Sequence, residues 1–196
     1  MQFFISFNGN SNEENDFLKN IYEPATIDNQ QRLGVDLFIP KTTTIESINN
    51  VGGLPAVIDL KIIVSLLNMD IYNATPPSIN EELEFTKELN SLTPFIVMPS
   101  IDNSFIDNSQ SLLSSVLLCK YELEENGSNV AHGKNIKLRI YNLSENAITI
   151  QAGTIVGKLL TAYRRTLKTS LKIISKDDFM YSEAFIEKLI EHGINI

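Results

Sequence analysis

The stretch "NIKLRIYNLS" (135–144) constrains the fold most strongly, because its apolar and polar side chains alternate without interruption. The residues on the two sides are Ile136, Leu138 and Ile140, and Lys137, Arg139 and Tyr141. A repeat of two residues is that of a β-strand, whose side chains point alternately to opposite faces of a sheet. The sequence therefore predicts a strand at 135–144 with one face buried and the other in water.

Other short apolar runs follow one another closely along the chain and are bounded by glycine, proline and polar residues. They are 2–7, 32–40, 52–67, 93–100 and 114–125. Many short strands separated by turn signals are typical of a β-sandwich or barrel. We therefore expect an all-β fold, with the polar stretch after the first strand, 8–16, forming a turn.

Two segments carry helix signals instead. A helix is predicted over 78–92, where Ser78 and Glu81 have the spacing of a capping box, and another over 175–193. The stretch between the last β-strand and this C-terminal helix alternates again and is predicted to be a strand at 162–174. We accordingly expect a β domain at 1–162, with an insertion at about 68–92 that holds a helix near 78–90, and a C-terminal strand and helix at 163–196.

The composition fits a soluble globular protein, with 43% hydrophobic and 20% charged residues. The longest apolar stretch, 57–69, is interrupted by Asp59 and Lys61, so no membrane span is expected. The opening "MQFFISF" lacks the basic region of a signal peptide, so we do not expect a secreted protein. Cys119 is the sole cysteine, which favours a reducing compartment, and one cysteine with two histidines predicts no metal site. The Asn-X-Ser/Thr triplets are accordingly not expected to carry glycans; they begin at Asn73, Asn126 and Asn142.

The net charge of −8 is distributed unevenly. Eight basic residues and one acid, Glu145, lie between Lys134 and Lys172, whereas the remainder holds 8 basic and 23 acidic residues. This basic region could be a solvated or subunit-facing surface, or a patch for nucleic acid, but an acidic chain is a poor general nucleic-acid binder. We therefore do not expect nucleic acid as a partner, and we expect a protein interaction surface at Arg164, Arg165, Lys168 and Lys172.

Several stretches, taken in order, resemble the trimeric all-β deoxyuridine triphosphatase family. Gly34, Asp36 and Leu37 match the Ala-Gly-x-Asp-Leu strand of its first motif, "TPFIVMPSIDNS" (93–104) looks like the second, and 129–160 resembles the third and fourth. The resemblance covers about residues 20–162. It implies a jelly-roll-like β-barrel or sandwich and a homotrimer that exchanges its C-terminal strand between subunits, for which 162–174 would be suited.

The catalytic positions of that family are largely replaced in this chain. The resemblance implies a magnesium–triphosphate substrate, a carboxylate general base, a phosphate-binding arginine and a tyrosine against the deoxyribose. Alignment on the third motif puts Ser128 at the base and Ala131 at the tyrosine, and neither side chain can do that work. The arginine and glutamine of the fourth motif become Ile155 and Lys158, which leaves Ser100 and Lys158 as remnants of a phosphate site.

The resemblance therefore suggests a non-catalytic protein without a cofactor. Because large DNA viruses often carry this enzyme, and because the chain is rich in Asn, Ile and Lys, we expect a homotrimeric minor capsid or capping protein. Its partners would be other virion proteins, and its place the virion or the host cytoplasm.

Three alternatives stay open at this point. The first is a divergent dUTP diphosphatase, or the related deoxycytidine triphosphate deaminase, that uses Asp36 and Asp102 with Mg²⁺. The second is a nucleotide sensor, which would bind without turnover. The third is an unrelated jelly roll.

Overall fold

The described part of the computed structural model comprises residues 1–27, 34–74, 93–99, 112–114, 116–119, 134–161 and 170–174. Within these ranges the chain is mostly β-sheet, with two helices, α1 (Asn12–Ile27) and α2 (Met69–Ala74). The all-β class predicted from the sequence is confirmed. Neither helix in this part of the chain is long and apolar enough to cross a membrane.

The larger sheet has five strands in the order β11-β1-β4-β8-β6. Their bounds are β1 (Gln2–Phe7), β4 (Ala56–Leu67), β6 (Leu112–Ser114), β8 (Lys134–Asn142) and β11 (Ser170–Ile173). Neighbours in this sheet pair antiparallel, except that β11 lies parallel to β1 at one edge. The end of the stretch predicted as a strand at 162–174 is thus β11, on the edge of this sheet.

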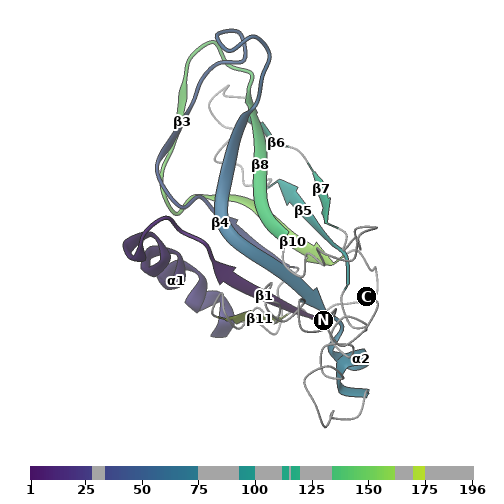
Figure 1. The fold of residues 1–196 in the computed structure, drawn as a ribbon. Helices are drawn as coiled ribbons and strands as arrows, with labels where there is room; N and C mark the ends of the chain where they lie inside the picture. Colours follow the sequence, from purple (N-terminus) through teal and green to yellow (C-terminus); the bar gives the residue numbers. More distant parts are fainter. Residues whose placement is uncertain are drawn as a thin grey trace, which may run out of the picture.

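The second sheet is antiparallel, with four strands in the order β2-β10-β5-β7. Its strands are β2 (Val35–Phe38), β10 (Ile155–Thr161), β5 (Phe95–Pro99) and β7 (Leu117–Cys119). A separate ribbon pairs β3 (Thr43–Ile45) with β9 (Ile148–Ile150) and extends toward the tip of the molecule (Figure 1).

The apolar faces of the two sheets pack against each other in one core. Buried residues of β1, β4 and β8 share a single cluster with those of β2, β5 and β10. The rings of Phe3 and Phe95 meet edge to face across the layers, with their centroids 5.9 Å apart. In β8 the predicted alternation is confirmed, because Ile136, Leu138 and Ile140 are buried while the residues between them face outward.

Helix α1 corrects the expectation of a turn at 8–16. Ser11 begins the helix: its hydroxyl accepts a hydrogen bond from the Glu14 backbone N–H at 3.3 Å. The Glu14 carboxylate in turn accepts from the Asn10 N–H at 2.6 Å. Residues that cap helices are also common in turns. This polar stretch is therefore compatible with a turn or with the start of a helix, unless the residues that follow it are considered as well.

The helix closes one side of the sandwich. The ring centroid of its Tyr22 lies 5.8 Å from that of Phe7 on β1 and 5.1 Å from that of Phe38 on β2. Leu18 and Tyr22 are both fully buried, and α1 also contacts β11. The helix therefore fills the space between one edge of each sheet (Figure 1).

The strand expected at 114–125 is confirmed in its described part only at β7, which lies in the smaller sheet. Ser114, the first residue of that stretch, instead ends β6 in the larger sheet, and the exposed Val116 lies between the two strands. The helices predicted at 78–92 and 175–193 lie outside the described residues, as do 120–125 and 162–169.

The buried side chain of Asn142, which we call the polar hub, holds the loops at the tip of the molecule together by hydrogen bonds. Asn142 is 1% exposed; its Nδ2 donates to the carbonyls of Ile45 at 2.9 Å and Asn146 at 2.8 Å. Its Oδ1 accepts from the backbone N–H of Ser144 at 3.0 Å and from the Ser144 hydroxyl. Because both amide hydrogens are used and the side chain is buried, the triplet at Asn142 does not offer a glycan acceptor in the folded protein.

Candidate functional site

The two candidate residues Asp36 and Lys158 lie side by side on neighbouring strands. They are register partners on β2 and β10, and the Lys158 Nζ is 3.1 Å from the Asp36 Oδ1. They come from stretches that resemble the first and fourth motifs, which are far apart in the sequence. The fold thus joins these two stretches at one place in the smaller sheet.

Two glycines allow the strands of this site to approach closely. Gly34 has a φ of +90°, and a Cβ at this position would collide with the Leu159 carbonyl oxygen on β10. A Cβ on Gly157 would lie 2.9 Å from the Met98 carbonyl oxygen on β5, at the point where the β2–β10 register shifts. Only glycine tolerates both the positive φ and the close contact at Gly34.

A tight turn at Gly153 precedes the closing strand β10. Gly153, with φ of +80°, donates its N–H to the Ile39 carbonyl at 2.9 Å, and the Ile39 N–H donates to the Thr154 carbonyl at 3.0 Å. Ile155 then enters β10 opposite Phe38. The backbone at Thr154 and Ile155 is therefore paired with Ile39 and Phe38, at the end of β2.

Tyr22 is a neighbour of this site that the sequence did not reveal. Its hydroxyl accepts a hydrogen bond from the Phe38 N–H at 3.3 Å, at the outer edge of β2. Burial raises the pKa of Tyr22 well above its ordinary value; the hydrogen bond from Phe38 opposes this shift, and the negative charge of Asp36 adds to it. The phenol is therefore neutral. Leu18 and Tyr22, four residues apart after the Ser11–Glu14 cap, were the signal that could have revealed it.

The charges of Asp36 and Lys158 balance each other. Their side chains are 20% and 41% exposed, so water screens the pair and its contribution to stability is about 0–1 kcal/mol. In chemical terms the arrangement is a cross-strand ion pair within a sheet.

The resemblance implies a magnesium ion for an active enzyme; of the two carboxylates that would then serve, Asp36 and Asp102, Asp36 alone lies in the described part of the chain. Magnesium prefers several oxygen ligands, and carboxylates usually supply one or two of them. No group of three or more His, Cys, Asp or Glu side chains that could hold a metal occurs in the described ranges. The carboxylate that is present, Asp36, already faces Lys158.

The remaining candidates are distributed differently. Lys172 lies on β11 in the other sheet, is exposed, and has its Nζ 5.8 Å from the centre of the Phe4 ring. The structure does not bring it to Asp36. The other predicted site residues lie outside the described residues: Ser100, Asp102, Ser128, Ala131, Arg164, Arg165 and Lys168.

Comparisons with known proteins found no relative of this chain. No family model matches the chain, and no curated protein matches it. The likeness to the deoxyuridine triphosphatase family consequently rests on the residues quoted above.

Proposed function

We propose that this protein is a non-catalytic structural or interaction protein built on a deoxyuridine-triphosphatase-like scaffold. The observation that carries the proposal is the ion pair between Asp36 and Lys158, with Nζ and Oδ1 at 3.1 Å. In an enzyme of that family, these two motifs supply groups that act on a triphosphate. Here the groups at these positions engage each other.

The surroundings of the pair support a scaffold in the same way. Ile155 stands where the resemblance places a phosphate-binding arginine, and it is half-buried as a strand residue opposite Phe38. An aliphatic side chain offers no hydrogen bond to a phosphate oxygen. A phosphate approaching Lys158 would have to compete with Asp36 and would meet its negative charge.

The proposed assembly follows from the resemblance. We propose a homotrimer that serves as a minor capsid or capping protein in a large DNA virus particle, with other virion proteins as partners and the virion or host cytoplasm as its place. We propose that Lys172, together with the basic residues Arg164, Arg165 and Lys168 that precede it in the sequence, meets a protein.

The test is a direct assay for the chemistry that the proposal denies. The protein is incubated with dUTP and with dCTP in the presence of Mg²⁺, beside an active trimeric dUTP diphosphatase as the positive control, and pyrophosphate and deaminated products are measured. We expect no product above the rate without protein. Pyrophosphate release that is lost on Asp36→Ala would overturn the proposal in favour of a hydrolase.

Binding and assembly are measured on the same preparation. Thermal unfolding with and without deoxynucleotides separates a scaffold from a sensor, because a ligand that binds the folded state raises the melting temperature. We expect no shift, and a shift that saturates would favour the sensor. Light scattering coupled to size exclusion should give a mass of three chains, and a strict monomer would count against the assembly.

A further inference from the structure

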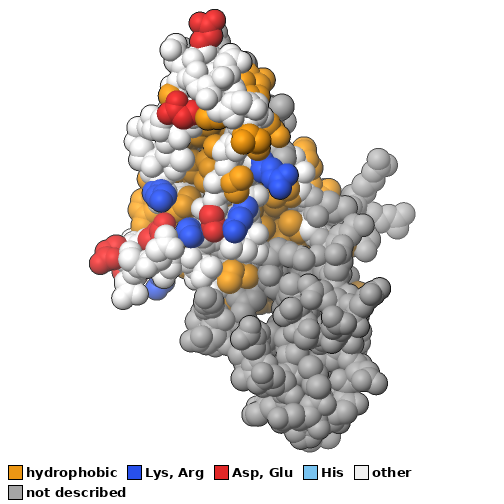
Figure 2. Space-filling view, turned by 45° about the horizontal axis from the view of Figure 1, so that its top comes forward, with side chains coloured by type: hydrophobic (Ala, Val, Ile, Leu, Met, Phe, Trp, Pro, Cys, Tyr) orange, Lys and Arg blue, Asp and Glu red, His pale blue; other side chains and the backbone are white. Residues whose placement is uncertain are grey.

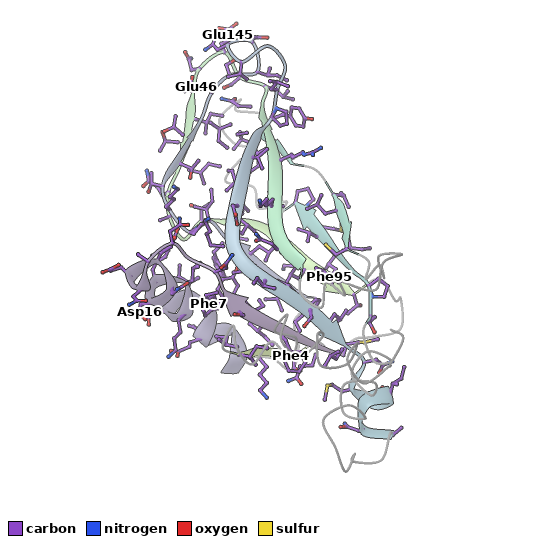
Figure 3. All side chains as sticks on the ribbon, viewed as in Figure 1. Phe4, Phe7, Asp16, Glu46, Phe95 and Glu145 are labelled. Atoms are coloured by element: carbon purple, nitrogen blue, oxygen red, sulfur yellow. The ribbon has the colours of Figure 1, made fainter. Side chains whose placement is uncertain are left out.

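One face of the β4–β8 pair, continued by the loops at its tip, carries exposed and half-buried side chains in a definite order from the tip inward. At the tip are two exposed acids, followed by exposed apolar residues and then by a group of cations. We name these the acidic end (Glu46 and Glu145), the apolar middle (Val51, Leu54, Val57 and Leu143) and the basic end (Lys61, Lys137 and Arg139). Figure 2 shows the same order as red at the tip, orange below it and blue further down, and Figure 3 labels both acids at the tip.

The apolar middle holds an unusual share of exposed apolar side chains. Val51 is 37%, Leu54 69%, Val57 62% and Leu143 49% exposed, and these are four of the six large exposed hydrophobic residues in the described ranges. Clusters of this kind rimmed by polar residues mark protein–protein contacts more often than isolated exposed residues do.

The loops that carry this patch are held firmly. The Ser47 carbonyl accepts hydrogen bonds from the N–H groups of Asn50 at 2.9 Å and Val51 at 3.3 Å, and the Gly53 N–H donates to the Ile48 carbonyl at 2.9 Å. The Ile48 N–H donates to the Asn142 carbonyl at 2.8 Å, which ties this turn to the polar hub. A surface whose backbone is already ordered loses less conformational entropy when it binds a partner.

The basic end has more cations than its single acid can balance. Asp59 faces Lys137 across the strands, with Nζ and Oδ2 4.0 Å apart, and its Oδ2 is 3.5 Å from the Nζ of Lys61. Arg139 lies opposite Val57 in the register, beside the apolar middle. Asp59 against three cations leaves a net charge of about +2, and the acidic end carries about −2.

A β-bulge places Lys61 in this group. The β4–β8 register shifts between Asp59 and Ile63, and Lys61 has a φ of +58°. Its backbone N–H donates to the Asp59 Oδ1 at 2.9 Å, and its Nζ donates to the Asn10 Oδ1 at 3.2 Å. A lysine in this left-handed conformation is strained by roughly 1–3 kcal/mol, and such bulges often direct a side chain to a binding surface.

We propose that this face binds the same face of a second copy of the chain across a two-fold axis. When two copies lie antiparallel, the acidic end of each meets the basic end of the other, and the two apolar middles meet at the centre. A two-fold contact uses one patch twice, so that patch must complement itself, and the order acid, apolar, base has this property. A purely acidic partner, such as nucleic acid or an acidic peptide, would be repelled by Glu46 and Glu145.

This contact does not depend on the proposed trimer. If the protein is a monomer without it, the two-fold contact makes a dimer; if the protein is a trimer, the same contact joins two trimers. The expected sign in either case is a mass that doubles with concentration.

Two charge-reversed variants test the proposal by sedimentation over a range of concentrations. Lys137→Glu with Arg139→Glu makes both ends acidic, and Glu46→Lys with Glu145→Lys makes both ends basic. Each variant alone should raise the dissociation constant of the two-fold contact at least about tenfold, because like charges then face each other. An equimolar mixture of the two should recover the doubled mass, since every end again meets its opposite.

Matched controls come from α1, away from the tip, where Figure 3 labels Asp16. Lys19→Glu and Asp16→Lys change the charge by the same sign on exposed positions of the helix and should leave the contact intact. Circular dichroism and the melting temperature show whether each variant is folded, and Leu54→Ser supplies a variant that weakens the contact without changing charge.

The outcomes separate this proposal from the proposed function. A trimer whose mass doubles at no concentration overturns the two-fold contact alone, as do variants with the association of the wild type. A wild-type dimer supports the contact while contradicting the trimer. A monomer at every concentration contradicts both.

Discussion

The molecule sets an aspartate opposite a lysine in each of its two sheets, and the two arrangements differ in their charge balance. In the smaller sheet, Asp36 and Lys158 pair one to one, at 3.1 Å, and their charges cancel. In the larger sheet, Asp59 pairs with Lys137 in the register and also with Lys61, which the bulge adds. Two extra residues in β4, between Asp59 and Ile63, thus separate a neutral element of the scaffold from a positively charged surface. The first arrangement underlies the proposed function, and the second underlies the proposed two-fold contact.

Replacing Gly34 should have the largest effect, because it breaks the approach of β2 to β10 that brings Asp36 to Lys158. We expect Gly34→Ala to lower the free energy of unfolding by about 2–5 kcal/mol, from the steric conflict with the Leu159 carbonyl together with the strained φ. Denaturant unfolding measures the change.

Gly53→Ala is the matched control, because Gly53 has a φ of +85° but a Cβ there would touch nothing within 4 Å. The free energy of unfolding of this variant should fall by only about 1–2 kcal/mol, which is the cost of the positive φ alone. Equal losses in the two variants would show that the close contact between β2 and β10 is not what requires Gly34.

Tyr22→Phe should have an intermediate effect and should change the response to alkaline pH. At pH 7 the loss of the acceptor for the Phe38 N–H should lower the free energy of unfolding by about 1–3 kcal/mol. Because the pKa of Tyr22 is higher in the folded than in the unfolded protein, its contribution is complete below about pH 10 and is lost as the pH rises further.

The difference in stability between wild type and Tyr22→Phe should therefore shrink between about pH 10 and 12. Urea unfolding at successive pH values measures it, and the comparison cancels the titration of the lysines that both proteins share. A difference that is constant with pH would contradict the burial of a neutral phenol beside Asp36.

The smallest effect on stability is expected when the ion pairs themselves are removed. Measuring it in both sheets compares the two arrangements directly. A double-mutant cycle with Asp36→Asn and Lys158→Met should give a coupling of about 0.2–1 kcal/mol that falls with salt. The cycle with Asp59→Asn and Lys137→Met should give less, because the 4.0 Å distance is longer and Lys61 shares the same carboxylate. A larger coupling at Asp59 would reverse this order.

Local patterns predicted the strands well where one face alone is buried. The alternation at 135–144 reports the burial of β8 directly, since a period of two leaves no other regular structure. By contrast, α1 was missed because Ser11 and Glu14 are equally suited to a turn, and because Pro24, inside the helix, argues against one. The assignment of β6 and β7 to different sheets had no local signal, because both are short, largely apolar segments and the two residues between them do not indicate which sheet each joins.

The candidate site shows the same limit at longer range. The sequence singled out Asp36 and Lys158 separately, through the motifs that they resemble. Their pairing depends on the register of two strands far apart in the chain, which no local pattern encodes. The position of Tyr22 beside the site could be predicted only together with helix α1. Because the capping residues of α1 were interpreted as a turn, this neighbour of the site was missed as well.

The position of β11 has a consequence for how the protein folds. β1 pairs with β4 on one side and with β11 on the other, so residues 2–5 meet residues 170–173. During synthesis the open edge of β1 cannot be satisfied in this way until residues 170–173 have been made. Pairings of such sequence separation are slow, and an unpaired edge is a template for association with other chains. The β1–β11 pairing should therefore be among the last to form, and a chain that stops before residue 170 should aggregate readily.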